Sequence, residues 1–159
     1  MRRPLMAGNW KMFKTVRETE QFLEEFIPLV AQASHCDIAV APPFTALATA
    51  ARITRGSRVA VAAQDVYWEK QGAFTGEVSP GMLVEAGCFY SIIGHSERRE
   101  YFGETDETVH KKLRAALGAG LVPIVCMGEN LSEREAGRTD EVLRAKFALC
   151  GCLGLRSRQ

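Results

Sequence analysis

Residues 89–95 read Phe-Tyr-Ser-Ile-Ile-Gly-His, a short apolar run that ends at a glycine and gives way to a polar segment. The run 89–93 does not alternate apolar and polar residues, so we expect a strand that is buried on both faces, as in a parallel sheet. Amphipathic stretches with helical spacing follow this run and four others. Alternation of strands and helices indicates an α/β fold. The other four runs are 5–11, 38–41, 59–63 and 121–126.

Helix signals lie between the runs. Thr15 and Glu18 have the spacing of a capping box, which predicts the start of a helix. Pro28 predicts that this helix ends or kinks near Ile27. Ser79 before Pro80 predicts the start of a short helix that ends near residue 85. Further helices are expected at about 45–55, 106–117 and 139–148.

The first and last strand-like runs begin at residues 5 and 121, so four βα steps take about 29 residues each. Five parallel units fit two architectures. One is an open, doubly wound, flavodoxin-like sheet, which is complete at this length. The other is part of a (β/α)8 barrel, which needs roughly 250 residues for eight units. The pattern alone favours the open sheet.

The composition excludes several classes of partner. The chain has 159 residues, of which 47% are hydrophobic and 25% charged, and its formal net charge is +1. That balance predicts one ordinary folded domain and gives no support for a nucleic-acid or anionic-membrane partner. No apolar run approaches the roughly 18 residues of a membrane span, and the start of the chain lacks a signal-peptide pattern. We therefore expect a cytoplasmic protein.

The five cysteines form no CxxC pair and no cluster with histidine. We therefore expect free thiols in a reducing compartment and no metal. Cys150 and Cys152 flank a glycine, which leaves open a metal-ligand pair or a strained disulfide. The other three cysteines are Cys36, Cys88 and Cys126.

Functional side chains of both architectures lie where the strands end. No GxGxxG, Walker A or GxSxG pattern occurs in the sequence, so dinucleotide, P-loop and serine-hydrolase chemistry lack support. The strand-end rule selects Asn9, Lys11, Gln64, His95, Glu97 and Glu129.

Four of these candidates have a functional and an ordinary interpretation. His95 precedes a short expected helix, whose N-terminus disfavours a protonated imidazole, so a neutral His95 can donate to a developing oxyanion. It can equally cap the strand and bond to backbone. Lys11 offers an ammonium to an anionic or enediolate-like substrate, or is a solvated strand-end lysine. Asn9 orients Lys11 or bonds to loop backbone, and Glu97 pairs with Lys11 or belongs to a solvated charged helix.

Five motifs make the sequence recognisable: Ala-Gly-Asn-Trp-Lys-Met at 7–12, Ala-Pro-Pro-Phe at 41–44, Gly-Ala-Phe-Thr-Gly-Glu at 72–77, Ile-Gly-His-Ser-Glu-Arg-Arg at 93–99 and Pro-Ile-Val-Cys-Met-Gly-Glu at 123–129. In order and spacing they resemble the N-terminal part of the triosephosphate isomerase family. The resemblance covers residues 4–146 and replaces the open sheet with a partial (β/α)8 TIM barrel of about five βα units, which this chain cannot close alone. Residues 1–146 are then an incomplete barrel domain, and 147–159 an atypical tail.

The resemblance also implies residue roles. His95 matches the neutral electrophile that polarises the substrate carbonyl and moves protons between its oxygens. Lys11 matches the substrate-binding cation, Asn9 its neighbour in the site, and Glu97 the carboxylate beside that lysine. The implied reaction interconverts dihydroxyacetone phosphate and glyceraldehyde 3-phosphate through an enediolate, in glycolysis and gluconeogenesis, without metal or cofactor. Loop 65–78, with Phe74 and Thr75 at its tip, matches the segment that inserts into a second subunit of a homodimer.

The tail departs from the family. The glutamate that abstracts the substrate proton, the lid after it and the glycine-rich phosphate loops have no counterpart here, and Glu129 matches a structural residue of the fifth strand. We therefore expect a truncated or frame-shifted family member with little or no isomerase activity alone. One alternative is a non-catalytic fragment that binds a complementary half or another partner. Another is an open α/β domain with a new ligand.

Overall fold

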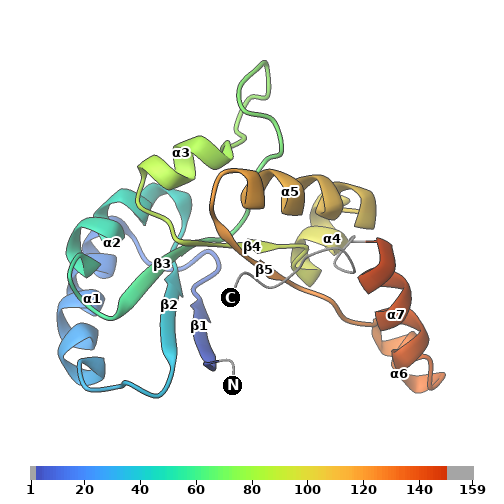
Figure 1. Ribbon diagram of the computed structural model, residues 1–159, viewed down its shortest axis with the longest axis horizontal. Helices are drawn as coiled ribbons and strands as arrows, with labels where there is room; N and C mark the ends of the chain where they lie inside the picture. Colours follow the sequence, from blue (N-terminus) through green and yellow to red (C-terminus); the bar gives the residue numbers. More distant parts are fainter. Residues whose placement is uncertain (1–2, 150–159) are drawn as a thin grey trace.

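Five short strands form one parallel sheet in the computed structural model, which describes residues 3–149 (Figure 1). They lie in chain order, β1-β2-β3-β4-β5, and each neighbouring pair is parallel. A flavodoxin-like sheet would place its first strand between two others. The observed order excludes that alternative and matches a partial (β/α)8 barrel. The strands are β1 (Leu5–Asn9), β2 (Asp37–Ala41), β3 (Val59–Ala63), β4 (Tyr90–Ile93) and β5 (Val122–Val125).

Helices connect the strands, and Figure 1 shows α1, α2, α3 and α5 along one side of the curved sheet. This placement leaves the opposite, concave side to the residues that point into a barrel. The helices are α1 (Val16–Val30), the 3-10 turn η1 (Phe44–Ala46), α2 (Leu47–Thr54), α3 (Pro80–Glu85), α4 (Ser96–Phe102), α5 (Asp106–Gly118), α6 (Leu131–Glu135) and α7 (Thr139–Leu149).

The predicted helix starts are confirmed. Thr15 caps α1 in a complete capping box, in which its backbone N–H donates to the Glu18 carboxylate at 2.7 Å. Ser79 caps α3 by accepting from the backbone N–H of Met82, with Pro80 at the first helical position. Short polar side chains before apolar helical stretches therefore set these two boundaries.

Pro28 was predicted to end or kink α1 near Ile27, and the end is wrong, because the helix continues through Pro28 to its last residue, Val30. Pro28 lies in the final turn, where the backbone N–H of Ala31 donates to its carbonyl. A proline there removes one helical hydrogen bond at a point where the helix is about to end. Ile27 and Val30 also pack against the core, which favours keeping the last turn.

Apolar residues fill two layers on either side of the sheet. The larger layer lies between the sheet and the helices and includes the fully buried Leu23, Leu83 and Ile93. A smaller cluster combines alanines of β2 and β3 with Tyr90 and Ile92 of β4. The two layers use alternate residues of the same strands, which explains why the strand sequences are apolar without alternation.

The expected burial on both faces holds for the central strands and fails at the two edge strands, which an unclosed barrel leaves exposed. Residues of β2, β3 and β4 are almost all buried, whereas Leu5 and Met6 of β1 and Val122 of β5 are exposed. Among the described residues, β1 pairs with β2 alone and β5 with β4 alone. The edge strands are therefore open where a closed barrel would cover them.

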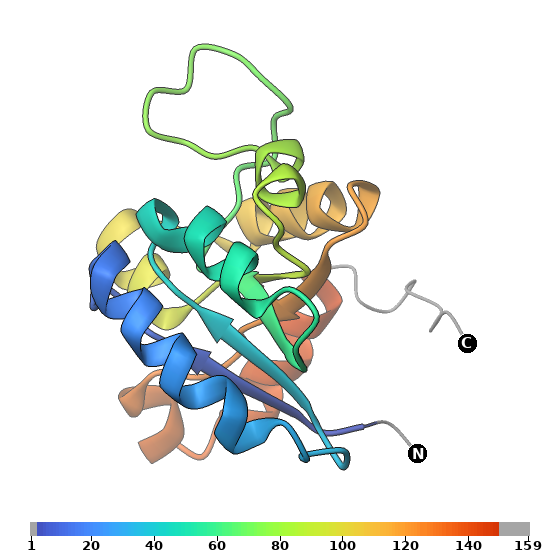
Figure 2. The same ribbon diagram turned by 90° about the vertical axis from the view of Figure 1, so that its left-hand side faces the viewer.

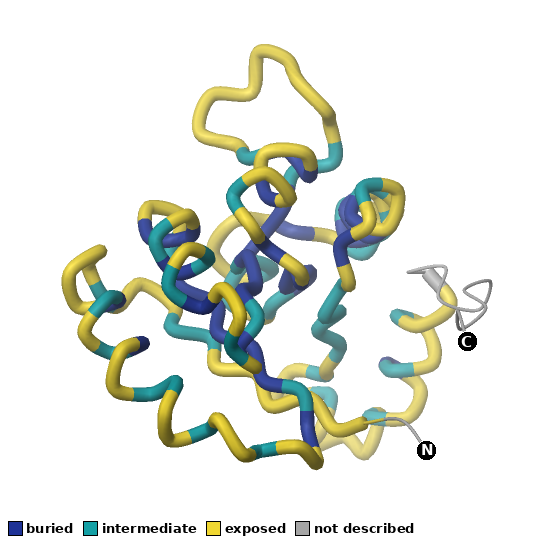
Figure 3. Tube along the Cα trace, turned by 60° about the vertical axis from the view of Figure 1, so that its left-hand side comes forward, coloured by how far each residue is buried: buried dark blue, intermediate teal, exposed yellow. Residues whose placement is uncertain are grey.

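The segment between β3 and α3 protrudes from the body of the molecule (Figure 2). Its base is closed by the backbone N–H of Tyr67, which donates to the carbonyl of Val78 at 2.9 Å. The Tyr67 ring packs on Trp68 and Phe74, with centroids 4.1 and 4.7 Å apart. Thr75 lies in the exposed stretch of this segment (Figure 3).

Helix α7 extends through Leu149, so residues 147–149 continue an element of the fold. The rest of the predicted tail, with Cys150 and Cys152, lies outside the described residues, and a boundary at residue 146 stays a prediction. Cys36, Cys88 and Cys126 are free thiols, and burial raises the pKa of Cys88 to about 12. Between residues 3 and 149, no helix has the length and apolar character to cross a membrane.

Candidate active site

The carboxyl ends of the strands bring most of the predicted site residues together. A cleft of about 520 Å³ is lined by side chains that follow β1, β3 and β4, with the exposed Met12 and Phe13 at its margin. This convergence is what parallel strands of one register produce, since their carboxyl ends share one edge. The predicted residues that line the cleft are Asn9, Lys11, Gln64, His95 and Glu97.

Lys11 has a left-handed backbone, with φ of 53°. Such a conformation costs an L-residue roughly 1–2 kcal/mol and needs support from its surroundings. The backbone N–H of Lys11 donates to Asn9 Oδ1 at 3.0 Å, and the side-chain amide of Gln64 donates to the Lys11 carbonyl at 2.8 Å. The same Gln64 nitrogen bonds the carbonyl of Ala41 at 2.8 Å. Gln64 therefore ties the strained residue to the end of β2.

The Lys11 ammonium is held by Glu97, with Nζ 2.6 Å from Oε1. Both side chains are nearly half exposed, so the ammonium remains open to the cleft while its direction is set. The hydrogen bond from Lys11 lowers the pKa of Glu97 below its ordinary value. Of the two interpretations of Glu97, the geometry supports the partner of Lys11.

His95 caps the N-terminus of α4, and its Nδ1 accepts from the backbone N–H of Glu97 at 3.2 Å. An N–H donor requires a lone pair on Nδ1, so the proton of a neutral imidazole sits on Nε2. His95 therefore caps the helix and keeps one N–H available as a donor. The capping and the proton-donating interpretations of His95 are therefore compatible, because they use different ring nitrogens.

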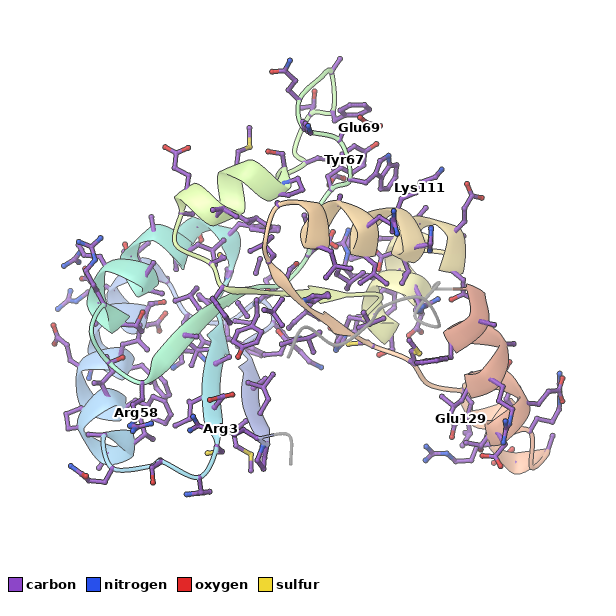
Figure 4. The ribbon with its side chains drawn as sticks, viewed as in Figure 1. Arg3, Arg58, Tyr67, Glu69, Lys111 and Glu129 are labelled. Carbon is purple, nitrogen blue, oxygen red and sulfur yellow. The ribbon has the colours of Figure 1, made fainter. Side chains whose placement is uncertain are left out.

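Glu129 lies outside the Lys11 cleft. It lines a separate cavity of about 340 Å³ with His95 and Cys126, and Figure 4 shows it beside α6 and α7. Its Oε1 accepts from Arg134 Nε at 2.7 Å and from the Thr139 hydroxyl at 3.3 Å. Hydrogen bonds from its own backbone N–H and from Arg134 lower the pKa of Glu129. These contacts fit a structural carboxylate that joins α6 to the first residue of α7.

A buried ion cluster beside the cleft was missed by the sequence reasoning. Lys112 of α5 bonds both carboxylate oxygens of Asp65, at 2.7 and 2.9 Å, and also Oε1 of Glu104. Arg98 of α4 pairs with the same two acids, at 2.9 Å to Asp65 and 3.4 Å to Glu104. The signal was present at Lys112, which shares a helical face with the buried Val109, Leu113 and Ala116.

Comparison with known proteins agrees with this arrangement. A sequence model of the triosephosphate isomerase family matches residues 4–151. The chain is 57% identical to the triosephosphate isomerase of Solibacter usitatus over 159 residues, which are 100% of this chain and 64% of that protein. It is 55% identical to the triosephosphate isomerase of Geobacter metallireducens over 147 residues, 92% of this chain and 59% of that protein. The chain thus spans about three-fifths of the length of these relatives.

A crystal structure of triosephosphate isomerase from Bartonella henselae superposes on the fold with a TM-score of 0.88 and 36% sequence identity. The superposition covers 93% of this chain and 61% of that chain, so this chain corresponds to about three-fifths of that structure. The family match, the shared fold and the motifs at the strand ends agree over almost the whole of the described residues. This chain belongs to the triosephosphate isomerase family.

Proposed function

We propose that the chain carries the N-terminal part of an active site that interconverts dihydroxyacetone phosphate and glyceraldehyde 3-phosphate through an enediolate. The observation that carries this proposal is the meeting of Lys11, His95 and Glu97 in one cleft of a chain that belongs to this family. The proposed setting is cytoplasmic glycolysis and gluconeogenesis, and the proton transfers need no metal or cofactor.

Each side chain has a proposed task. The Lys11 ammonium, fixed by Glu97, attracts the anionic substrate and the negative charge of the enediolate. Neutral His95 donates from Nε2 to the developing oxyanion and moves a proton between the two substrate oxygens. Asn9 supports the strained backbone of Lys11. A preformed set of donors costs little reorganisation during the reaction.

The 159-residue chain by itself is expected to turn over little or no substrate. Relatives extend well beyond the part that this chain covers, and the resemblance assigns the proton-abstracting glutamate and the phosphate loops to that remaining part. A general base contributes about 10²–10⁴-fold, and remote phosphate contacts orient the substrate. A coupled assay of the pure folded chain should therefore stay near background. Turnover at the rate of ordinary isomerases would contradict this expectation.

The site assignment is tested by supplying the missing part. The chain is mixed with the segment of the Solibacter usitatus relative that it does not cover, and turnover is measured. We expect activity in the mixture and a loss of about 10²–10⁴-fold on His95→Gln. His110→Gln on α5 is the matched control and should retain activity. An active mixture that tolerates His95→Gln would overturn the proposed role of His95.

A second candidate function is a non-catalytic fragment that binds a complementary half. The open edges of β1 and β5 favour it, because unpaired strand edges readily accept another chain. Co-elution of the two segments in size-exclusion chromatography without turnover would support binding alone. Separate elution at micromolar concentration would count against both a binding and a complementing role.

We also propose a homodimer formed through loop 65–78, with Phe74 and Thr75 at the contact. The loop protrudes from the body of the molecule (Figure 2), and within it the Tyr67 ring packs on Phe74. Light scattering should then give twice the chain mass of 17.5 kDa. Thr75→Arg should shift the mass towards the monomer, whereas Leu29→Arg on the exposed face of α1 should not. A monomer at all concentrations would contradict this proposal.

A further inference from the structure

The buried ion cluster of Asp65, Arg98, Glu104 and Lys112 lies one residue away from both groups that hold Lys11. Asp65 directly follows Gln64, whose amide bonds the Lys11 carbonyl. Arg98 directly follows Glu97, whose carboxylate bonds the Lys11 ammonium. Successive Cα atoms are 3.8 Å apart across a rigid peptide, so a shift of either cluster residue moves its neighbour.

Three members of the cluster are buried, and the fourth, Arg98, also lines the cleft. Lys112, Asp65 and Glu104 expose 4–5% of their side chains, and Arg98 exposes 29%. Both cations contact both acids, so the cluster joins the end of β3, helix α4, the turn after α4 and helix α5. Lys112 is the member that α5 supplies from its apolar face, and it bonds three carboxylate oxygens.

A buried ion cluster is a weak argument for stability. Burying charges is costly, and burial raises the pKa of Asp65 although the Lys112 ammonium opposes the shift. Apolar side chains of similar size often stabilise an interior as well as a buried ion cluster does. Hydrogen-bonded ion pairs also fix the relative positions of their side chains, because each oxygen must meet its donor within a narrow range of angle and distance.

We propose that Lys112 is a positioning residue for Lys11, acting through Asp65 and Arg98 to fix Gln64 and Glu97. This inference rests on the proposed function for its purpose, but the geometry it concerns is present in the chain itself. Lys112 does not line the cleft. Through these neighbours Lys112 keeps Gln64 bonded to the Lys11 carbonyl and Glu97 bonded to the Lys11 ammonium.

The test uses the Glu97 carboxylate as a reporter in the 159-residue chain. Glutamate carboxyls are labelled with ¹³C and titrated by NMR, where the Lys11 hydrogen bond keeps the Glu97 pKa low. Lys112→Met should raise the Glu97 pKa towards its ordinary value, and Lys112→Arg should restore part of the shift. Lys111→Met is the matched control, since Lys111 is the neighbouring residue of α5, half exposed and paired with Glu107 (Figure 4). It should leave the Glu97 titration unchanged.

Glu141 of α7 serves as an internal control, because Arg138 lowers its pKa at a site apart from the cluster. A shift of Glu97 with Glu141 unchanged supports the proposal. An unchanged Glu97 in folded Lys112→Met, or equal shifts of both glutamates, overturns it. If Lys112→Met does not fold, Asp65→Asn is judged by the same criteria, and unfolding of both variants assigns the cluster a purely structural role and also overturns it. Isomerase assays of the complemented chain test the proposed function separately and leave this result unaffected.

Discussion

At the scale of single residues, Lys11 combines a strained backbone with a directed ammonium. Its φ of 53° is supported by Asn9 at its backbone N–H and by Gln64 at its carbonyl. Glu97 then sets the direction of the ammonium. The three supports follow or belong to β1, β3 and α4, so the position of the charge depends on elements that are far apart in the sequence.

Gln64→Leu should destabilise the fold by about 1–3 kcal/mol, because the carbonyls of Lys11 and Ala41 lose their shared donor. Urea denaturation followed by far-UV circular dichroism measures the change. Gln71→Leu, in the exposed part of the protruding loop, is the control and should change stability little. Equal losses for the two variants would show that the Gln64 bonds contribute nothing specific.

The Lys11–Glu97 pair predicts a pH dependence. The pKa of Glu97 is lower in the folded chain than its ordinary value of 4.5. A carboxyl of this kind stabilises the fold above its unfolded pKa, and that contribution disappears as the pH falls through the lower, folded pKa. Glu97→Gln should therefore be less stable than the unchanged chain at pH 7, and the difference should shrink below pH 4.5.

Urea midpoints at a series of pH values measure this difference. Glu100→Gln is the control on the same helix, and its stability relative to the unchanged chain should not follow this pH dependence. A Glu97→Gln difference that stays constant from pH 7 to pH 3 would show that the ion pair does not stabilise the fold.

At the scale of elements, the junction between β4 and α4 decides where His95 lies. Gly94 links the strand to the helix with φ of 75°, and its carbonyl accepts from Arg99 Nε at 2.9 Å. The helix then begins with His95 as its cap. The left-handed glycine allows the chain to turn sharply, so that His95 stays at the strand end and its Nδ1 meets the first turn of α4.

Gly94→Ala should cost about 1–3 kcal/mol. A Cβ at this position would lie 2.9 Å from Val109 Cγ2 and 3.3 Å from the carbonyl of Cys126, and the backbone conformation disfavours any side chain. Gly128→Ala is the control, since a Cβ there meets nothing within 4 Å. Thermal or urea unfolding of the two variants makes the comparison. Equal stabilities would mean that the junction can relax without strain.

At the scale of the whole molecule, the sheet of the described residues has two unpaired outer edges, at β1 and at β5. The central strands have partners on each side, whereas β1 and β5 each have one partner among the described residues. Exposed apolar side chains on β1 and β5 accompany these open edges. Another chain can pair with an exposed strand edge, so the unpaired edges of β1 and β5 favour association with a further chain.

Hydrogen exchange of the isolated chain should distinguish the outer strands of the sheet from the central ones. Backbone amides of β1 and β5 should exchange faster than those of β3 and β4, because local opening costs least where few contacts must break. Addition of the complementary segment of a relative should slow exchange at β1 and β5 selectively. Uniform protection across the five strands of the isolated chain would indicate that its edges are already covered.

Much of the fold was predictable from local patterns, because strand burial and helix capping depend on residues close together in the chain. The capping box at Thr15 and the Ser79–Pro80 helix start are examples. Pro28 was misjudged, since the packing of the last turn of α1 outweighs one lost hydrogen bond. An unclosed barrel predicts that the first and fifth strands are exposed, and β1 and the start of β5 are indeed exposed.

The sequence by itself determined the parallel α/β class, the family and the identity of the strand-end side chains. These follow from short apolar runs and motifs that are read along the chain. Only the tertiary structure decided that Gln64 holds Lys11, that Glu97 is its partner, and that Arg98 and Lys112 belong to a buried cluster with Asp65 and Glu104. These contacts join residues up to 86 positions apart, and the curvature and order of the sheet bring them together.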